Sequence, residues 1–409
     1  MTDRRKWIVG IAVLVVLAVV LAALLLRPDG SGTRDGSGAV AEDGVPTRAV
    51  GESIFDSSTN PDLSELLGIV GGLFLPDSGL ALVERGEIHM VDLASGETRV
   101  IGRRGEGPRE FGRIWTANHT PRGILVWDTL HRRAVFVAHD GEFLSSQGYR
   151  QVSFRNIFIS RPVGVGTDGR IVFRDGPDSF GGFGRGRLWD PAWYVVVQGD
   201  GEILRIAEAR GEEMYYGEHR SDAVTMGHRT FDAATEDHLI IADTDRAAIA
   251  VLDWSGSEVA VIPMPPSAQL SAAQVQAGRE LRIEQEQEFM AFFRRAAESG
   301  QLPARAGRVG DAEVAEAYSD WPINEIAPPI DTLLTDFDAR LWVRDYRLPD
   351  QDSVTWRVWD IDRPQPLFTV RMDGDDRLLD ATGDLLLLRR VDALDVPRAE
   401  VRRLTGAPE

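Results

Sequence analysis

The sequence predicts an all-β protein, a six-bladed β-propeller with one helical insertion, preceded by a single N-terminal transmembrane helix. Three observations support this prediction: a pattern of short strands and polar turns that recurs six times, the lack of crossover helices between most strands, and one long apolar run near the N-terminus. Short strands joined by polar turns pair antiparallel, whereas a parallel sheet needs long crossover connections. We therefore exclude a parallel α/β sheet.

The N-terminal apolar run covers residues 8–26 and contains no charged side chain. At about 1.5 Å per residue it nearly crosses a hydrocarbon core of about 30 Å. Basic residues at positions 4–6 precede it, so the positive-inside rule keeps the N-terminus in the cytoplasm and exports the rest of the chain. A cleaved signal peptide is the alternative, but its apolar region is usually only about 7–15 residues long. We expect a cytoplasmic tail (1–6), an anchor in the inner membrane (7–27), a flexible Gly/Ser/Asp linker (28–46) and a propeller outside the cytoplasm (47–409).

The composition excludes several kinds of partner and chemistry. Asp and Glu outnumber Lys and Arg by 64 to 45, and the formal net charge is −19. Binding of nucleic acid needs a dense basic surface, so we expect no nucleic-acid partner. The chain has no cysteine, which rules out disulfides, thiolate metal ligands and cysteine nucleophiles.

The repeated pattern begins at about residue 70, where an Asp/Gly turn leads into a short strand, a polar turn, a second strand and a third. The strands are rich in Val, Ile, Leu and aromatic residues, as in "GLALVERGEIHMVDLASGETRVIG" and "RGILVWDTLHRRAVFVAHDGEFL". One such sheet is marginally stable by itself, but six in a ring bury both faces of every sheet. The last repeat shows three strands before the chain ends, so we expect Thr47–Phe55 to supply the fourth strand and close the ring.

The stretch "IGRRGEGPREFGRI" (101–114) has two interpretations, a loop that cradles a phosphate and a corner between two repeats. A dinucleotide loop needs a helix after it, and a nucleoside-triphosphate loop needs Gly-Lys-Ser/Thr; neither is found here. The sequence therefore favours the corner, in which the glycines permit positive φ angles and Pro108 fixes the exit of the chain. Phe111 is then free to pack between adjacent sheets.

The same region resembles the signature of NHL-type six-bladed β-propellers, in which a Gly-x-x-Gly-x-Gly-Pro-x-x-Phe corner precedes a repeat of the form "lyVaDsgNhRiqvFdpdG". The matching residues are Gly102, Gly105, Gly107, Pro108, Phe111, Val126, Asp128, Arg133, Val135, Phe136, Asp140 and Gly141. The resemblance covers residues 70–405 in organisation and is close over 100–145. It implies a fold, in the style of membrane-anchored or secreted bacterial propellers, and it implies no reaction.

Two turns of the repeat carry an aspartate followed by an arginine, and the resemblance implies a structural role for both. We expect Asp128 with Arg132 or Arg133, and Asp243 with Arg246, to bond turn amides and blade edges. The alternative is that these turns surround one mouth of a central channel and contact a ligand there. The candidate ligand-binding residues are Arg103, Arg104, Asp128, His131, Arg132, Asp243, Arg246 and Asp345.

The sequence shows no convincing catalytic or metal-binding set. None of the seven histidines forms His-x-x-x-His or His-Glu-x-x-His, and no Gly-x-Ser-x-Gly elbow occurs. His89, His131 and His238 lie in different repeats, as zinc ligands do in some enzymatic propellers, but we expect them at the surface or at strand ends. We therefore expect no catalytic residue, no metal ligand and no cofactor. The alternative is a lyase or lactonase-like hydrolase with calcium or zinc in the channel.

A helical insertion is expected at about 268–305, where Ser271 and Gln274 form a capping box and Gly300 ends the helix. Its apolar stripe, made of Leu281, Phe289, Phe292 and Phe293, is expected to pack on the propeller's own flank, with self-association through this helix as the alternative. A glycine-rich insertion at 174–190 is expected to be a spacer, with a partner contact as the alternative.

These features together predict a membrane-tethered, extracytoplasmic binding module for a protein, peptide or glycan on one face of the propeller. A rigid platform that carries many loops, joined to a flexible tether, favours this function over catalysis.

Overall fold

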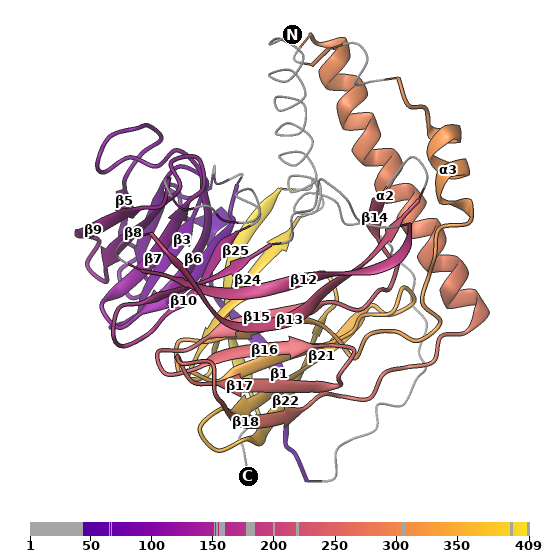
Figure 1. The fold of residues 1–409 in the computed structure, drawn as a ribbon. Helices are drawn as coiled ribbons and strands as arrows, with labels where there is room; N and C mark the ends of the chain where they lie inside the picture. The colour runs from indigo at the N-terminus through magenta and orange to yellow at the C-terminus, as the bar shows by residue number, and fades with distance from the viewer. Residues whose placement is uncertain are drawn as a thin grey trace.

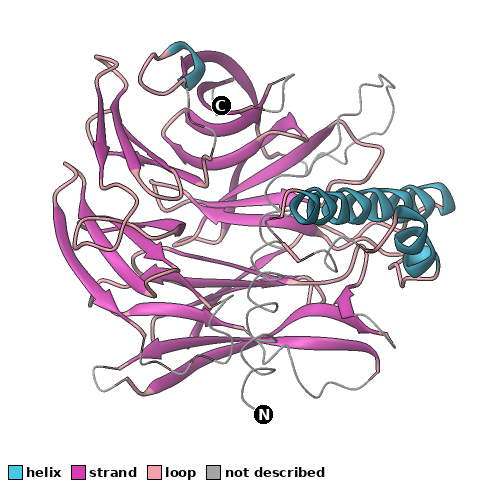
Figure 2. Ribbon diagram, turned by 90° about the horizontal axis from the view of Figure 1, so that it is seen from above, coloured by secondary structure: helices cyan, strands magenta, loops and turns pink. Residues whose placement is uncertain are grey.

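The computed structural model describes residues 44–406 with gaps at residues 65, 67, 151, 153, 155–159, 177–184, 199–200, 218–220, 301, 304–307 and 393–395. The described chain is mostly β, with a propeller-like arrangement of sheets and two α-helices (Figures 1 and 2), so the predicted fold class is confirmed at this level. The predicted cytoplasmic tail, the membrane anchor and most of the linker lie outside the described residues. No α-helix among the described residues has the length and hydrophobicity that a membrane span requires.

Six antiparallel units follow one another along the chain, and three of them are four-stranded meanders. The first unit contains β2 (Gly71–Leu75), β3 (Gly79–Val83), β4 (Ile88–Asp92) and β5 (Thr98–Ile101). The second unit contains β6 (Ile114–Thr120), β7 (Gly123–Asp128), β8 (Arg133–Ala138) and β9 (Phe143–Gly148). The fourth unit contains β15 (Thr230–Ala234), β16 (Leu239–Asp243), β17 (Ala248–Leu252) and β18 (Glu258–Pro263).

The third unit is larger than the others. It contains β10 (Arg161–Val165), β11 (Ile171–Asp175), β12 (Gly186–Val197), β13 (Ile203–Tyr216) and the short β14 (Ser221–Ala223). β12 and β13 pair from Gly186 opposite Tyr216 to Val197 opposite Ile203. The sequence pattern does not predict this long pair, because the glycine-rich insertion obscures where β12 begins. Residues 177–184 of that insertion lie outside the described residues, while its two ends belong to β11 and β12, so the predicted spacer is wrong at both ends.

The fifth and sixth units share one eight-stranded sheet. The fifth unit contains β19 (Ile330–Thr335), β20 (Leu341–Asp345), β21 (Ser353–Asp360) and β22 (Gln365–Asp373). The sixth unit contains β23 (Arg377–Thr382), β24 (Leu385–Val391), β25 (Pro397–Thr405) and β1 (Thr47–Asp56). β1 pairs antiparallel with β25 and parallel with β22, so the N-terminal strand completes the C-terminal unit, as the sequence predicts.

Arg48 holds this closing strand in place. Its buried side chain donates hydrogen bonds to the carbonyl oxygens of Gly406 and Leu404, at 3.0 and 3.2 Å, and to the carboxylate of Asp384, at 2.8 Å. A guanidinium that satisfies three acceptors from the C-terminal part of the chain fixes both the register and the position of the N-terminal strand.

The connections between strands divide the molecule into two faces. The turns between the first and second strands of a unit, and those between its third and fourth strands, lie on the face that we call the turn face. These turns are all short, and residues 336–340 form one of the longest. The connections from second to third strand, together with those between units, form what we call the loop face. The loop face carries the corner at 102–113 and the long segment 264–329, which includes both helices (Figure 1). The longest connections between strands therefore lie on the loop face.

Continuous apolar strands fill the space between the units. All six residues of β7 and all five of β16 are buried, because each sheet has a neighbour on both faces. Phe111 is fully buried among residues of the first and second units, so its predicted position between adjacent sheets is confirmed.

The glycine corner agrees with the prediction in part. Gly102 has φ of +77°, and a Cβ at this position would lie 2.4 Å from the ring of Phe111. The predicted positive φ angles at Gly105 and Gly107 are wrong. One left-handed residue is enough, because Glu110 accepts a hydrogen bond from the Gly107 amide at 2.9 Å and so turns the rest of the loop.

The insertion forms two helices, α2 (Ala272–Glu298) and α3 (Asp311–Ser319). The predicted capping box of Ser271 and Gln274 is present, and Gly300 follows the last turn of α2 with φ of +76°. The sequence analysis did not identify α3, although its N-terminal acidic residues and the spacing of Val314 and Tyr318 are typical of a helix.

The apolar side of α2 packs on the protein itself. Ile283 and Met290 contact a cluster formed by α3 and its neighbours, which contains Val314, Tyr318, Trp321 and Tyr215. Arg282 of α2 pairs with Asp222 of β14. Of the predicted stripe, Phe293 is buried and Phe292 is 40% exposed, so the residues that pack on α3 are not the ones that the sequence analysis named. Packing of the stripe on the propeller's own flank and self-association through Phe292 both stay predictions.

Candidate functional site: a central cavity

A cavity of about 1190 Å³ lies where the first strands of all six units meet. Each of β2, β6, β10, β15, β19 and β23 contributes residues to its wall. Small side chains and glycines, among them Gly71, Gly72 and Gly164, line its middle. A Cβ added to Gly72 would lie 2.6 Å from Leu387, and one added to Gly164 would lie 2.4 Å from Ala234, so close packing between units requires glycine there.

The loop-face end of the cavity carries charged and aromatic side chains. Arg161 begins β10, Arg229 precedes β15 and Trp115 lies near the start of β6. Arg229 is half-exposed and lies 3.4 Å from Glu212, while Trp115 is partly buried beneath the guanidinium of Arg113. Guanidinium and indole groups at a mouth suit hydrogen bonding and stacking with a polar ligand.

Asp232 organises the arginines at this end. Its fully buried carboxylate lies 2.6 Å from Arg161 and 2.9 Å from Arg174, and it accepts a hydrogen bond from the Tyr194 hydroxyl at 3.2 Å. Burial alone would raise the pKa of Asp232, but the two guanidiniums outweigh burial and hold the pKa below its usual value. The carboxylate is therefore ionised at neutral pH, and it fixes the direction of both arginines.

The turn-face end of the cavity contains a histidine–aspartate pair. Nε2 of His119 lies 2.8 Å from Oδ2 of Asp380, and the same carboxylate oxygen accepts the amide of Phe74 at 2.7 Å. Burial lowers the pKa of His119, but the carboxylate of Asp380 outweighs burial, and the pKa lies above its usual value. The raised pKa favours the protonated imidazole, so the pair is a short, charge-assisted contact.

Aromatic packing narrows this end. The ring of Phe337 meets His119 edge-on, with 5.4 Å between ring centroids. His119 belongs to the second unit and Phe337 to the fifth, so the contact reaches across the cavity. Next to Phe337, burial raises the pKa of Asp336 to about 6 although Arg340 lies 2.7 Å away. Asp336 and Phe337 both line the turn-face end of the cavity.

The predicted site residues in the corner lie on the loop face, outside the wall of this cavity. Arg103 is largely exposed, and its guanidinium lies 2.6 Å from the carboxylate of Glu110. The backbone of Arg104 forms an isolated β-bridge with that of Phe111. Both residues are near Trp115 in the sequence, but neither side chain lines the cavity. Ligand binding by these two residues stays a prediction.

Asp128 has the structural role that the sequence analysis expects. Its buried carboxylate accepts the amides of Gly112 and Arg113, both at 3.0 Å, and Nδ1 of His131, at 2.7 Å. Burial alone would raise the pKa of Asp128, but these hydrogen bonds lower it. Arg132, with φ of +51°, donates to carbonyl oxygens of the following loop. His131 also lines a smaller cavity of about 590 Å³.

The remaining predicted residues lie in equivalent turns. Asp243 accepts the amide of Asp245 at 3.1 Å and lies 3.5 Å from Arg246, whose side chain is largely exposed. Asp345 pairs with Arg357 at 2.8 Å. The eight predicted residues thus share one face, as the sequence analysis supposed, but none of them lines the central cavity. Their part in binding stays a prediction.

Sequence reasoning missed the residues that line the cavity. The pairs join distant parts of the chain: His119 and Asp380 are 261 residues apart, and Arg161 and Asp232 are 71 apart. One signal was present, because polar residues such as His119 and Asp232 interrupt the first strand of a repeat. In a propeller the first strand faces the axis, so such residues are candidates for the channel wall.

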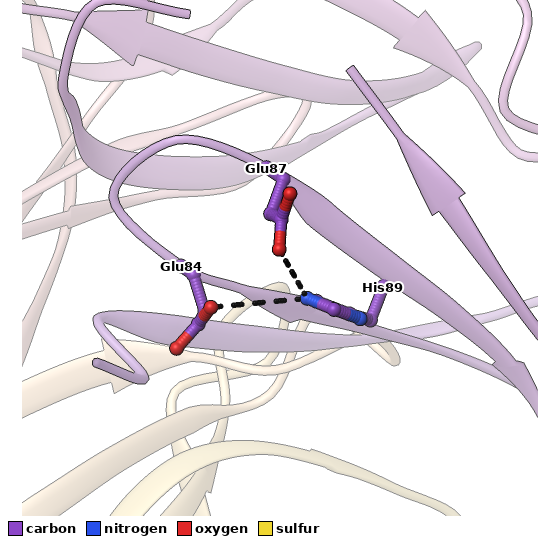
Figure 3. Close-up of side chains that lie close together, drawn as sticks. All are labelled: Glu84, Glu87 and His89. Carbon is purple, nitrogen blue, oxygen red and sulfur yellow. Dashed lines mark ion pairs between the residues drawn. The ribbon is translucent and has the colours of Figure 1, made fainter. Parts of the chain in front are cut away.

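One group of side chains in the described residues has the geometry of a metal site. Glu84, Glu87 and His89 lie near the β3–β4 turn, and their ligand atoms are within 4.8 Å of one another (Figure 3). This group is on the loop-face side of the first unit and outside the cavity wall. The three histidines in different repeats do not meet, since His89, His131 and His238 all lie outside that wall.

Comparison with known proteins gives structural likeness alone. No family model matches the chain, and no curated protein matches it at the required significance. A member of the DUF4221 family from Bacteroides vulgatus is 9% identical with a TM-score of 0.46, over 89% of this chain and 97% of that chain. A Bacteroides fragilis protein named as exported is 12% identical with a TM-score of 0.40, over 83% and 92%. The β-propeller domain of the Trilobed protease from Pyrococcus furiosus is 9% identical with a TM-score of 0.36, over 82% and 79%.

These similarities are too low to carry an argument about function, and no match specific to the NHL-type family was found. Membership of that family stays a prediction.

Proposed function

We propose that the chain is a six-bladed propeller that acts outside the cytoplasm as a binding module, tethered to the inner membrane by residues 7–27. Its ligand is a protein, peptide or glycan, part of which enters the mouth of the central cavity at the loop face. The proposal is supported above all by the difference between the two ends of the cavity. The turn-face end is narrowed by His119 and Phe337, whereas the loop-face end presents Arg161, Arg229 and Trp115.

The position of the elaborations supports the same face. The long β12–β13 pair, β14 and both helices rise on one side of the molecule (Figure 1). The side chain of Gln274 at the start of α2 donates to Asp350, in the loop between β20 and β21, at 3.1 Å. This contact joins the start of α2 to a loop of the loop face.

The path of the chain suits a tether. β1 begins at the turn face, where Arg48 contacts the β23–β24 turn through Asp384. A flexible linker of about 20 residues has an r.m.s. reach of roughly 25 Å. If residues 7–27 lie in the membrane, the turn face is held toward the bilayer and the loop face is free to meet a ligand.

The test is a screen of the full-length chain on glycan and peptide arrays, with two variants matched in exposure. Arg229→Ala removes a cation from the loop-face mouth, and Arg170→Ala removes one from the turn face; their side chains are 49% and 47% exposed. We expect Arg229→Ala to lose signals that the wild type and Arg170→Ala retain. Absence of any specific signal, or equal loss in both variants, would contradict the proposal.

The alternative function is a lyase or lactonase-like hydrolase with a divalent metal in the cavity. The His119–Asp380 pair is the feature that favours it, because a paired imidazole is a common acid–base group. Among the described residues, however, the one three-ligand group lies in the first unit and not in the cavity wall. We therefore keep this enzyme as the alternative to the binding function.

A further inference from the structure

The β3–β4 hairpin brings three metal-ligating side chains onto one face. Val83 pairs with Ile88, so Glu84 and Glu87 are the next cross-strand pair, and the amide of Glu84 donates to the Glu87 carbonyl at 3.0 Å. Glu87 and His89 are two residues apart, and alternate residues of a strand point to the same side. The sequence Glu-Arg-Gly-Glu-Ile-His thus places two carboxylates and an imidazole together.

The distances within this group suit a single cation. Nε2 of His89 lies 3.3 Å from Oε1 of Glu87 and 3.9 Å from Oε2 of Glu84. Figure 3 shows both carboxylates directed at the same ring nitrogen. With zinc–ligand bonds of about 2.0–2.2 Å, tetrahedral ligand atoms lie roughly 3.3–3.5 Å apart, and the His89–Glu87 distance already fits this range.

His89 supplies an independent reason to expect a ligand. The residue is 5% exposed, and neither ring nitrogen has a hydrogen-bond partner. A buried polar atom without a partner is unfavourable, so an imidazole in this state is explained by a bound group. The atom closest to both carboxylates is Nε2, which is the usual donor of a neutral imidazole to a metal.

The two glutamates point to a cation for the same reason. Like charges directly opposite each other on paired strands are destabilising. Glu84 is held in place, since its Oε1 accepts the amide of Gly68 at 2.9 Å, so it cannot simply turn away. A divalent ion between the carboxylates removes the repulsion and satisfies His89 at once.

We propose that Glu84, Glu87 and His89 form a zinc site on the loop-face side of the first unit. One nitrogen and two carboxylate ligands suit zinc, while calcium prefers six to eight oxygen ligands. The fourth position is open to water, because Glu87 is 36% exposed. This site is independent of the proposed binding function.

The place of the site indicates a structural role. The site lies on the β3–β4 hairpin, in which the carbonyl oxygen of Arg85 accepts a hydrogen bond from the Ile114 amide at 2.6 Å. A Cβ added to Gly86 of the same hairpin would lie 3.2 Å from Arg104. Zinc bound here would stiffen the hairpin that supports the corner at 102–113. It would therefore order one sector of the loop face.

In the experiment, the metal-stripped full-length chain is titrated with zinc chloride, and binding is measured by isothermal titration calorimetry. We expect one equivalent of tight binding in the wild type, at least about tenfold weaker binding in Glu87→Gln, and wild-type binding in Glu97→Gln, an exposed acid in the β4–β5 turn of the same unit. Calcium chloride at the same concentration should give no corresponding binding. Cobalt(II) should give a visible absorption band typical of four-coordinate sites in the wild type and not in Glu87→Gln.

The thermal melting of the metal-free proteins provides a second readout. Because Glu87→Gln removes a like-charge contact, its melting temperature without metal should equal or exceed that of the wild type. Zinc should raise the melting temperature of the wild type and leave that of Glu87→Gln nearly unchanged. The assignment would be overturned by any of three results: no zinc binding by the wild type, binding as tight as the wild type in both Glu87→Gln and Glu84→Gln, or a preference for calcium.

Discussion

The two ends of the central cavity are built from different chemistry. At the loop face, Asp232 holds Arg161 and Arg174, which are charged at every physiological pH. At the turn face, Asp380 holds His119, whose charge depends on pH in the neutral range. The first end carries the permanent charges of these arginines, while the second contains a histidine that titrates and that meets the ring of Phe337.

This difference suggests that the two ends of the cavity have different roles. A mouth whose charge is independent of pH keeps a constant binding surface for a ligand. A narrowed end with a histidine–aspartate pair joins the second and sixth units and so stabilises the ring. The predictions below separate these two roles, and they run from the largest expected effect to the smallest.

The largest effect is expected for Asp232→Ala. The substitution leaves two guanidiniums in the wall without their buried partner, which costs about 3–5 kcal/mol of unfolding free energy. Urea unfolding of the full-length chain measures this. Asp375→Ala is the control, since Asp375 is 53% exposed and its pair with Arg347 should contribute about 0–1 kcal/mol. Equal destabilisation by the two substitutions would remove the distinction between a buried organiser and a surface pair.

A smaller, pH-dependent effect is expected at the other end. The folded-state pKa of His119 is raised, so the stability that its pair with Asp380 contributes is fully present below about 6.5 and is lost as the pH rises through the folded-state pKa. The difference in unfolding free energy between the wild type and His119→Gln should therefore shrink above pH 6.5. His238→Gln, a turn-face histidine of similar exposure, is the control and should not reproduce the pattern. A difference that is constant from pH 5 to 9 would contradict the assignment.

Two other carboxyl groups should make the unfolding free energy depend on pH in two separate ranges. The pKa of Asp232 is lowered, so its contribution is present above its unfolded value of 3.8 and is lost only as the pH falls through the lower folded-state value. The pKa of Asp336 is raised to about 6, so its ionisation reduces stability as the pH rises from about 4 to 6. Unfolding at closely spaced pH values with Asp336→Asn should flatten that window and move the His119 window to lower pH, because the charge of Asp336 contributes to the raised pKa of His119. Loss of both windows in Asp336→Asn would show that the two groups titrate as one.

The smallest effect on stability is expected for Arg103→Ala. Arg103 is 79% exposed, and exposed pairs such as that with Glu110 contribute little, so the unfolding free energy should change by less than about 0.5 kcal/mol. This makes Arg103→Ala a clean test of whether the corner contacts a ligand. Weaker binding to an array ligand at unchanged stability would support the predicted role of Arg103, and unchanged binding would remove it from the site.

The sequence predicted the features that depend on local chemistry. The short apolar strands, the capping box at Ser271, the closing strand from Thr47 and the packing of Phe111 follow from periodicity, capping and edge pairing, and all are present. The structural role of Asp128 in its turn also follows from local spacing.

The candidate site could not be predicted in the same way, because its members meet through the closure of the ring. Whether His119 faces Asp380 depends on the register of β6 and β23 relative to the axis, and a shift of one residue would turn either side chain away. The β-bulge in β23 between Leu378 and Asp380 sets that direction, and no residue type marks it in the sequence. The length of β12 and β13 was hidden for a similar reason, since long strands and polar loops have overlapping compositions there.

The most direct test of the binding function is the affinity of an array-identified ligand for the two matched arginine variants, measured by calorimetry on the full-length chain. The account predicts that Arg229→Ala, at the loop-face mouth, weakens binding at least about tenfold, or roughly 1.4 kcal/mol, while Arg170→Ala on the turn face binds as the wild type does. If Arg170→Ala weakens binding and Arg229→Ala leaves it unchanged, the ligand binds the opposite face and the account is wrong.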